Sequence, residues 1–151
     1  MPAIQTEFLF TITLDVPVIA LGDTPYGGRR IACFGAGSFE GPKLKGVVLP
    51  GGSDWLLSRP DGVREPNVRL PLRTDDGALI SMTYRGIRDI APEVFQRLLS
   101  GEAVEPSEYY LRTTPVFETA SEKYGWLNRI VAVGIGILEL TGVRYTVYVV
   151  L

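Results

Sequence analysis

The 151-residue sequence contains no histidine and only one cysteine, Cys33. Because histidine is absent, the chain cannot form a Ser–His or Cys–His nucleophile pair, nor a histidine-ligated zinc site. A single cysteine allows no internal disulfide, which fits a reducing cytoplasm. Cys33 stands between Ala32 and Phe34, and we interpret it as a small apolar residue. Acid–base chemistry must therefore come from aspartate, glutamate, tyrosine, lysine or the one cysteine.

Long apolar segments and basic runs are also missing. No segment reaches the roughly 18 consecutive apolar residues that a transmembrane helix needs, and the first residues lack the basic region of a signal peptide. The net charge is −2, and the longest basic run is the pair Arg29 and Arg30, which argues against a nucleic-acid-binding face. We therefore expect a cytoplasmic protein that binds neither membrane nor nucleic acid. No motif indicates a metal or a cofactor, so we expect neither.

The composition that remains is typical of one folded domain. Hydrophobic residues make up 46% of the chain. A chain of this length usually forms a single domain and buries about 70% of the surface that its unfolded form exposes. We therefore predict one domain that spans residues 1–151.

Turn signals divide the sequence into short segments. In residues 39–62, two short apolar runs lie between turns at 41–42, 50–52 and 60–62, each of which contains proline and glycine. Further on, Asp76 and Gly77 separate two segments of alternating polarity, which is a strong hairpin signal. These features are typical of antiparallel strands joined by tight turns.

Alternation predicts about nine strands and one helix. Proline and glutamate begin the helical segment Pro92–Leu99, and glycine follows it. Regularly spaced antiparallel strands favour a closed or nearly closed all-β barrel of about 8–10 strands, because closure removes exposed edges. A β-sandwich is the alternative. Besides the two runs in 39–62, the predicted strands lie in residues 7–21, 29–39, 63–72, 78–88, 108–119, 127–140 and 143–151.

Glycines recur two residues apart within predicted strands. Gly35 and Gly37 flank Ala36, and Gly134 and Gly136 lie in a later strand. Glycine weakens a strand unless the chain bends there or another backbone approaches closely. We interpret the first pair as a barrel corner. A phosphate-binding glycine loop is the alternative, but neither a Gly-Lys-Ser/Thr motif nor a helical pattern follows.

A series of short motifs runs through nearly the whole chain. It comprises Gly-Pro-x-Leu-x-Gly-x-Val-Leu-Pro-Gly-Gly-x-Asp-Trp at 41–55, Arg-x-Asp-Gly at 59–62, Thr-x-Asp-Gly at 74–77, Tyr-Tyr-x-Arg-Thr-x-Pro-x-Phe-Glu-Thr at 109–119 and Tyr-x-Trp-Leu-Asn at 124–128. This series resembles the DUF3237 family, also called UPF0311. Asn67 departs from it, since many relatives are expected to carry aspartate there.

The resemblance implies a small β-barrel of mostly unassigned function. Some fungal members are associated with ring closure in polyketide pathways, which resembles the acid–base addition of a hydroxyl group to an alkene or carbonyl system. The resemblance supplies no catalytic set that could be transferred to this chain.

Strand parity predicts which polar residues could meet. Every second residue of a barrel strand faces the interior. Arg112 and Glu118 share one parity of their segment, and we expect them to point inward. From strand parity we predict one shared cavity, lined by candidate acid–base residues and by candidate ligand-binding residues. The candidate acid–base residues are Glu118, Asp54, Glu40 and Tyr84, and the candidate ligand-binding residues are Arg69, Arg112, Trp126 and Asn128.

Structural roles compete with these assignments. An interior pair of Arg112 and Glu118 could fix the register of a barrel without any ligand, Asp54 could cap a turn after Gly52, and Trp126 could belong to the core.

Two functional hypotheses remain for a small organic partner. One is a cofactor-independent lyase or cyclase that uses a carboxylate and a tyrosine as acid and base. The other is a non-catalytic binding protein for a small apolar ligand. We also expect a homodimer, because two-fold dimers are the commonest assemblies.

Overall fold

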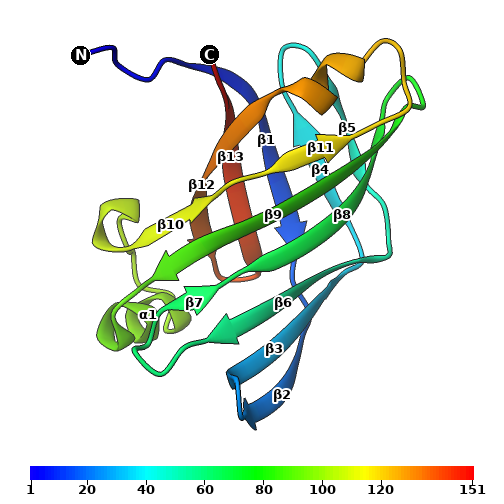
Figure 1. The fold of residues 1–151 in the computed structure, drawn as a ribbon. Helices are drawn as coiled ribbons and strands as arrows, with labels where there is room; N and C mark the ends of the chain where they lie inside the picture. Colours follow the sequence, from blue (N-terminus) through cyan, green and yellow to red (C-terminus); the bar gives the residue numbers. More distant parts are fainter.

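The computed structural model describes all residues from Met1 to Leu151, and Figure 1 shows its fold. Strands dominate it, as the sequence predicts. The strands are β1 (Thr6–Asp15), β2 (Val18–Thr24), β3 (Gly27–Phe34), β4 (Gly37–Glu40), β5 (Lys45–Val48), β6 (Gly52–Ser58), β7 (Arg64–Glu65), β8 (Asn67–Thr74), β9 (Leu79–Asp89), β10 (Tyr110–Thr113), β11 (Val116–Glu118), β12 (Val131–Glu139) and β13 (Gly142–Val150). The helical elements are α1 (Pro92–Leu99) and two 3₁₀ turns, η1 (Pro106–Glu108) and η2 (Gly125–Arg129).

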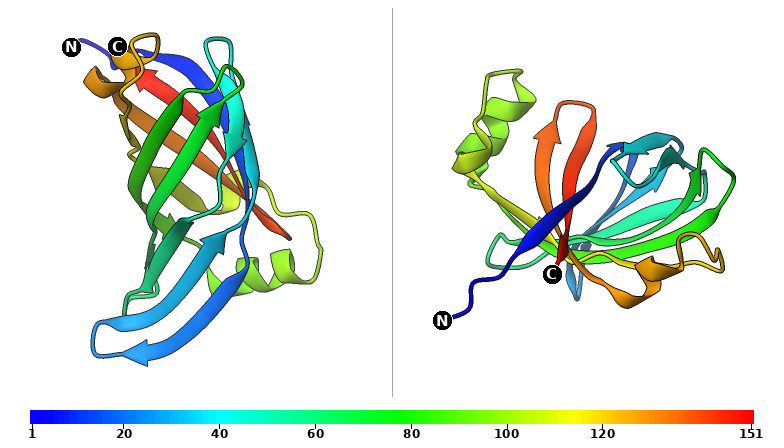
Figure 2. Two further views of the ribbon diagram at one scale, coloured as in Figure 1. Left: turned by 90° about the vertical axis from the view of Figure 1, so that its right-hand side faces the viewer. Right: turned by 90° about the horizontal axis from the view of Figure 1, so that it is seen from above.

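The strands close into an antiparallel barrel. Pairing runs from β9 through β10, β12, β13, β1, β4, β5 and β8, and then returns to β9. Strand β11 continues along β9 beyond β10 and pairs Val116 with Thr83. The predicted closed barrel is thus confirmed, and the sandwich alternative is wrong. The view from above in Figure 2 shows the strands wrapping around a common axis.

Three strands extend from the barrel as a projecting sheet, which we call the wing (β2, β3 and β6). Strand β6 pairs with β8 at only two positions, where Asp54 faces Val68 and Ser53 faces Arg69. Farther along the same edge β6 pairs with β7, its other edge pairs with β3 from Gly52 to Ser58, and β3 pairs with β2. The chain passes from the wing into the barrel at Gly35 and Ala36, between β3 and β4. This agrees with the barrel-corner interpretation of that glycine pair.

The barrel interior is filled by side chains. Twenty-three buried residues form one hydrophobic core. Phe10 lies at its centre, fully buried, with the ring centroids of Phe39 and Phe117 at 5.4 and 5.9 Å. Burying a side chain of this size stabilises the fold by about 1.5–3 kcal/mol. Side chains thus fill the barrel interior in which a ligand cavity was predicted.

Helix α1 occupies the predicted segment, and it lies at the end of the barrel opposite the chain termini, beside the tip of the β12–β13 hairpin (Figure 2). Proline begins the helix, and Gly101 follows it in the left-handed region at φ 81°. None of its residues is fully buried. No helix in this protein has both the length and the apolar character needed to cross a membrane.

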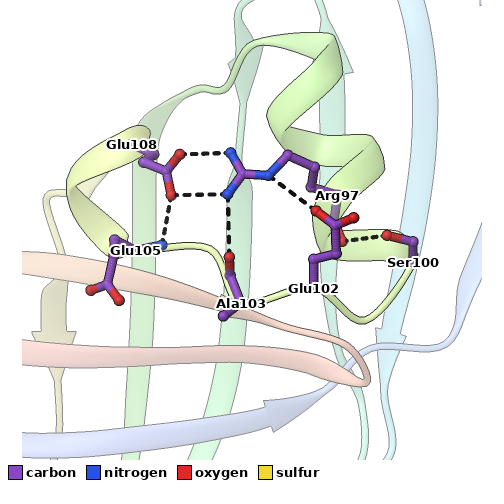
Figure 3. Close-up of polar contacts among 6 residues, drawn as sticks. All are labelled: Arg97, Ser100, Glu102, Ala103, Glu105 and Glu108. Atoms are coloured by element: carbon purple, nitrogen blue, oxygen red, sulfur yellow. Dashed lines mark hydrogen bonds and ion pairs between the residues drawn. The ribbon is translucent and has the colours of Figure 1, made fainter.

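A polar cluster around Arg97 attaches the end of α1 to the segment that follows it (Figure 3). The Arg97 guanidinium donates to both carboxylate oxygens of Glu108, at 2.7 and 3.5 Å, and to the Ala103 carbonyl at 3.3 Å. Glu102 accepts a further hydrogen bond from Arg97 Nε at 3.3 Å. Glu108 in turn accepts from the Glu105 amide at 2.9 Å. These contacts tie the end of α1 to the segment 102–108.

Candidate functional site

A cavity of about 290 Å³ opens at the barrel end where α1, the wing and the β12–β13 hairpin meet. This volume lies at the lower limit of ordinary small-molecule sites. Most of its wall is apolar. Representative wall residues are Ala32 and Phe34 of β3, Leu56 of β6, Leu98 of α1, and Leu138 and Val143 of the hairpin.

Seven polar side chains line this mostly apolar cavity, namely Arg30, Asp54, Tyr84, Arg88, Glu139, Thr141 and Tyr145. Asp54 comes from β6, Tyr84 and Arg88 come from β9, and Tyr145 comes from β13. The rings of Tyr84 and Tyr145 contact each other edge to face, with centroids 5.3 Å apart. Mostly apolar walls with a few convergent polar groups are characteristic of ligand sites.

Asp54 is the carboxyl group of this cavity that forms no ion pair, because Glu139, the other one, is paired with Arg144 at 3.0 Å. Burial raises its pKa, and two weaker effects oppose the rise: a hydrogen bond from a backbone amide and the positive charge of Arg88. The amide belongs to Asn67, and its nitrogen lies 2.9 Å from Asp54 Oδ1. Asp54 therefore joins β6 to the start of β8 rather than capping a turn after Gly52. A carboxyl group with a raised pKa can exchange protons closer to neutral pH than an ordinary aspartate.

The two tyrosines are fully protonated donors at neutral pH. Burial raises the pKa of Tyr84 well above its ordinary value, and the neighbouring Tyr145 and Asp54 raise it further. The pKa of Tyr145 is raised as well, chiefly by burial and then by Asp54. Phenol groups that stay protonated can donate hydrogen bonds to negative charge on a ligand oxygen.

Arg88 places a positive charge at the same cavity. Burial lowers its pKa to about 10, and the positive charge of Arg64 is the next cause. The pKa of Arg64 is lowered too, by burial and by Arg30. Both side chains stay protonated at neutral pH. The cavity lining combines the carboxyl groups of Asp54 and Glu139, the phenols of Tyr84 and Tyr145, and the cations of Arg30 and Arg88. No group of three or more cysteine, aspartate or glutamate side chains is placed to hold a metal ion.

Only two of the eight predicted site residues line this cavity, namely Asp54 and Tyr84. The prediction of one cavity shared by all eight is therefore wrong. The other six lie elsewhere: Glu40, Arg69, Arg112, Glu118, Trp126 and Asn128.

The orientation of the 110–118 segment is the reverse of the one predicted. The alternation itself is correct, but Leu111, Thr113 and Phe117 face the core. Arg112 and Glu118 consequently face outward. The Arg112 guanidinium lies 4.9 Å from the ring centroid of Tyr110, and Glu118 is exposed. No interior Arg–Glu pair exists.

Two further predicted residues lie on outer faces of barrel strands. Arg69 is exposed on β8, where Val68 and Leu70 take the inward positions. Glu40 is exposed at the end of β4, beside the buried Phe39.

Trp126 and Asn128 belong to η2 rather than to a strand, so strand parity does not apply to them. Asn128 is exposed, and its amide group makes two hydrogen bonds with the Thr119 backbone, at 2.8 and 2.9 Å. Trp126 packs against the core, and the Lys43 amine lies 5.4 Å from its ring centroid. Their positions are structural and lie outside the cavity.

Sequence reasoning missed Tyr145 and Arg88. The signal for Arg88 was present, because it continues the parity of Tyr84 and Gly86 along one strand. Tyr145 similarly shares the inward parity of Val143 and Val147 in the last strand. Both residues could have been found by extending the parity argument to every strand.

Comparison with known proteins establishes the family. The family model described as "Protein of unknown function (DUF3237)" matches residues 4–150. The chain belongs to the DUF3237 family. A UPF0311 protein of Clostridium acetobutylicum is 42% identical over 123 residues, which cover 82% of this chain and 78% of that protein. The resemblance inferred from the motifs is thus confirmed.

Solved structures of similar proteins share the whole fold. A conserved protein of unknown function from Rhodopseudomonas palustris superposes with a TM-score of 0.91 at 34% identity, and each chain is covered completely. A beta-barrel like protein from Acinetobacter baumannii gives a TM-score of 0.86 at 40% identity, over 100% of this chain and 98% of that one. An enzyme from Penicillium herquei shares the fold at 23% identity, with a TM-score of 0.75 and coverage of 100% and 98%.

Proposed function

We propose that this member of the DUF3237 family is a cofactor-independent lyase or cyclase that acts on a small organic molecule in the cavity at the α1 end of the barrel. The observation that carries the proposal is the position of Asp54. Its carboxyl group has a pKa raised by burial, and it borders the same cavity as the phenols of Tyr84 and Tyr145. A carboxyl group that exchanges protons and phenols that stay protonated are suited to separate roles in acid–base catalysis.

The addition of a hydroxyl group to a conjugated enone illustrates the chemistry. The Asp54 carboxylate removes the hydroxyl proton as the oxygen bonds to the β-carbon of the alkene. The electron pair of the alkene moves to the carbonyl oxygen, and the protonated tyrosines stabilise the resulting enolate through hydrogen bonds. Asp54 then returns the proton to the α-carbon, which restores its carboxylate. The reverse sequence is a lyase reaction, and neither direction needs an external oxidant or reductant.

The solved neighbour from Penicillium herquei supports an enzymatic role only by its description as an enzyme. At 23% identity it is evidence for the fold and carries no assignment of substrate or residues.

The test is to supply hydroxy-enones that can close to five- or six-membered cyclic ethers and to follow loss of the conjugated absorbance together with the enantiomeric excess of the product. Asp54→Asn should lower kcat by about 10²–10⁴-fold, the usual contribution of a positioned acid–base group. Glu118→Gln is the matched control, because Glu118 is an exposed carboxylate outside the cavity, and it should retain activity. Equal losses in both variants, or a racemic product at the uncatalysed rate, would contradict the proposal.

The alternative is a non-catalytic binding protein for a small apolar ligand, and the largely apolar wall favours it. The two hypotheses differ in what Asp54→Asn changes. An enzyme loses turnover and keeps ligand affinity, whereas a binding protein shows no turnover in any form and a modest change in affinity.

We also propose that the protein forms a two-fold dimer through β2. This strand pairs only with β3, so its other edge is unpaired. Ile19 and Leu21 of β2 are each 60% exposed. An apolar strand edge of this kind favours pairing with another chain. The β2 edge of a second copy would pair with it about a two-fold axis.

We retain the cytoplasm as the expected location.

A further inference from the structure

Arg64 and Arg88 form an unusual pair of like charges next to the cavity. They are direct partners across the β7–β9 pairing. The two guanidinium carbons lie 5.0 and 5.2 Å from the ring centroid of Phe95, a residue of α1. Like charges placed opposite each other on neighbouring strands destabilise a sheet. The fold nevertheless holds both arginines against one aromatic ring, with Arg88 in the cavity wall and Arg64 in an adjoining pocket that shares Phe95.

Each arginine also buries a donor that has no partner in the protein. Nη1 of Arg64 and Nε of Arg88 are inaccessible to solvent and make no hydrogen bond to any other group of the chain. A buried donor without an acceptor is costly, and more so when it carries charge. Costs of this kind are typically retained where a ligand removes them.

No carboxylate of the chain forms an ion pair with either arginine. Neither arginine takes part in any of the seven ion pairs of the chain. Asp61 and Glu65, which flank Arg64 in the sequence, are both paired with Arg59. Of the two cavity acids, Asp54 accepts a hydrogen bond from the Asn67 amide, and Glu139 is paired with Arg144.

The surroundings select the kind of anion that fits. Phe95 lies against both guanidinium groups, and the planar fork of a guanidinium group matches the two oxygens of a carboxylate. The adjoining cavity of about 290 Å³ is largely apolar and suits a small hydrophobic body. A carboxylate attached to such a body meets both conditions.

We propose that Arg64 and Arg88 bind the carboxylate of the ligand, so that the substrate class is a small hydrophobic organic acid whose apolar part fills the cavity. This inference rests on the proposed function for the location of the site and adds the chemical identity of the ligand. Arg64 and Arg88 are binding residues, which hold one end of the molecule while Asp54 and the tyrosines act on the other.

The experiment measures affinity for matched pairs of acid and amide by calorimetry at neutral pH. The probes are benzoate with benzamide and trans-cinnamate with cinnamamide, and phenyl phosphate tests the other source of an oxyanion. In the native protein at least one acid should bind about 10- to 100-fold more tightly than its amide, the range expected for hydrogen bonds to a charged group. If no acid outcompetes its amide, or if phenyl phosphate binds more tightly than both carboxylates, the proposal is wrong.

Three variants locate the effect. Arg88→Met and Arg64→Met should each remove most of the preference for the acid while leaving amide affinity unchanged. Arg69→Met is the matched control, because Arg69 is exposed on the outer face of β8, and it should keep the preference. A preference that survives in both Arg88→Met and Arg64→Met would overturn the assignment.

Thermal unfolding in the absence of any probe gives a second readout that needs no ligand. Replacing a buried, unpaired charge by an apolar side chain of similar length is stabilising in comparable cases. Arg88→Met should therefore raise Tm, whereas Arg69→Met should leave it unchanged. A lower Tm for Arg88→Met would mean that the guanidinium serves the fold, and this would count against the proposal.

The two proposals fail in different ways. Asp54→Asn should keep the preference for the acid, because Asp54 does not bind the carboxylate. If Asp54→Asn loses turnover but the native protein shows no preference for the acid, this inference alone is refuted. Acid preference without Asp54-dependent turnover would refute the proposed reaction alone.

Discussion

Replacing Gly136 by alanine should damage both the barrel and the cavity. Gly136 lies on the inward face of β12, and a Cβ added there would stand 2.7 Å from Cε1 of Tyr145 and closer still to Leu111. Ordinary contacts begin near 3.4 Å, so both side chains must move. Overpacking of this kind typically costs about 1–3 kcal/mol, which corresponds to a fall in Tm of about 2–12 °C for a domain of this size.

The matched control is Gly35→Ala. Gly35 has no neighbour within 4 Å of an added Cβ, and its φ is outside the left-handed region. This change should be neutral or stabilising by up to about 1 kcal/mol, because alanine restricts the unfolded chain. Calorimetric unfolding and cinnamate binding should separate the two variants. A Gly136→Ala protein with native Tm and native affinity would refute the described packing of Tyr145.

The remaining predictions concern pH, the helix and assembly. Burial raises the folded-state pKa of Asp54, so the free energy of unfolding should decrease as the pH rises from the ordinary aspartate pKa to the raised one. Urea titrations of Asp54→Asn should not show that decrease. Glu108 should give the opposite pH dependence. Arg97 lowers its pKa, so the stability that Glu108 contributes is present above its ordinary pKa and is lost on acidification. A Glu108→Gln protein that loses the same stability in acid would contradict this. Arg97→Ala should speed amide exchange in 92–109 but not in β8, and uniform exchange would argue against the contacts of Figure 3. Ile19→Lys should convert a sedimenting dimer into a monomer; a native protein that stays monomeric at every concentration would exclude assembly through β2.

The sequence predicted the fold well because turns and alternation are local signals. Proline–glycine turns and the Asp76–Gly77 hairpin mark where strands end, and the helix Pro92–Leu99 has its own start and stop residues. The wing was not predicted. Residues 29–39 look like one strand in sequence, but they divide at Gly35 and Ala36 between two sheets. Which sheet each half joins depends on long-range pairing that no local pattern records.

The site was predicted less well, because parity gives two faces without saying which one is inside. In the 110–118 segment both faces contain large side chains, and the polar face was assumed to line a cavity. The barrel instead turns Leu111 and Phe117 inward, since burying apolar area outweighs gathering polar groups. Asp54 and Tyr84 were identified correctly as cavity residues, and Arg88 and Tyr145 were missed because the parity argument was not extended to their positions.

The most direct test of the account is an NMR titration of the Asp54 carboxyl carbon in the native protein and in Arg88→Met. We predict a pKa above the ordinary value for the native protein, because burial outweighs the opposing effects of Asn67 and Arg88. We predict a further rise in Arg88→Met, because the lowering effect of that cation is gone. A native pKa at or below the ordinary aspartate value would contradict the claim that Asp54 is the acid–base group of this cavity. A value unmoved by Arg88→Met would show that the two side chains do not share the site.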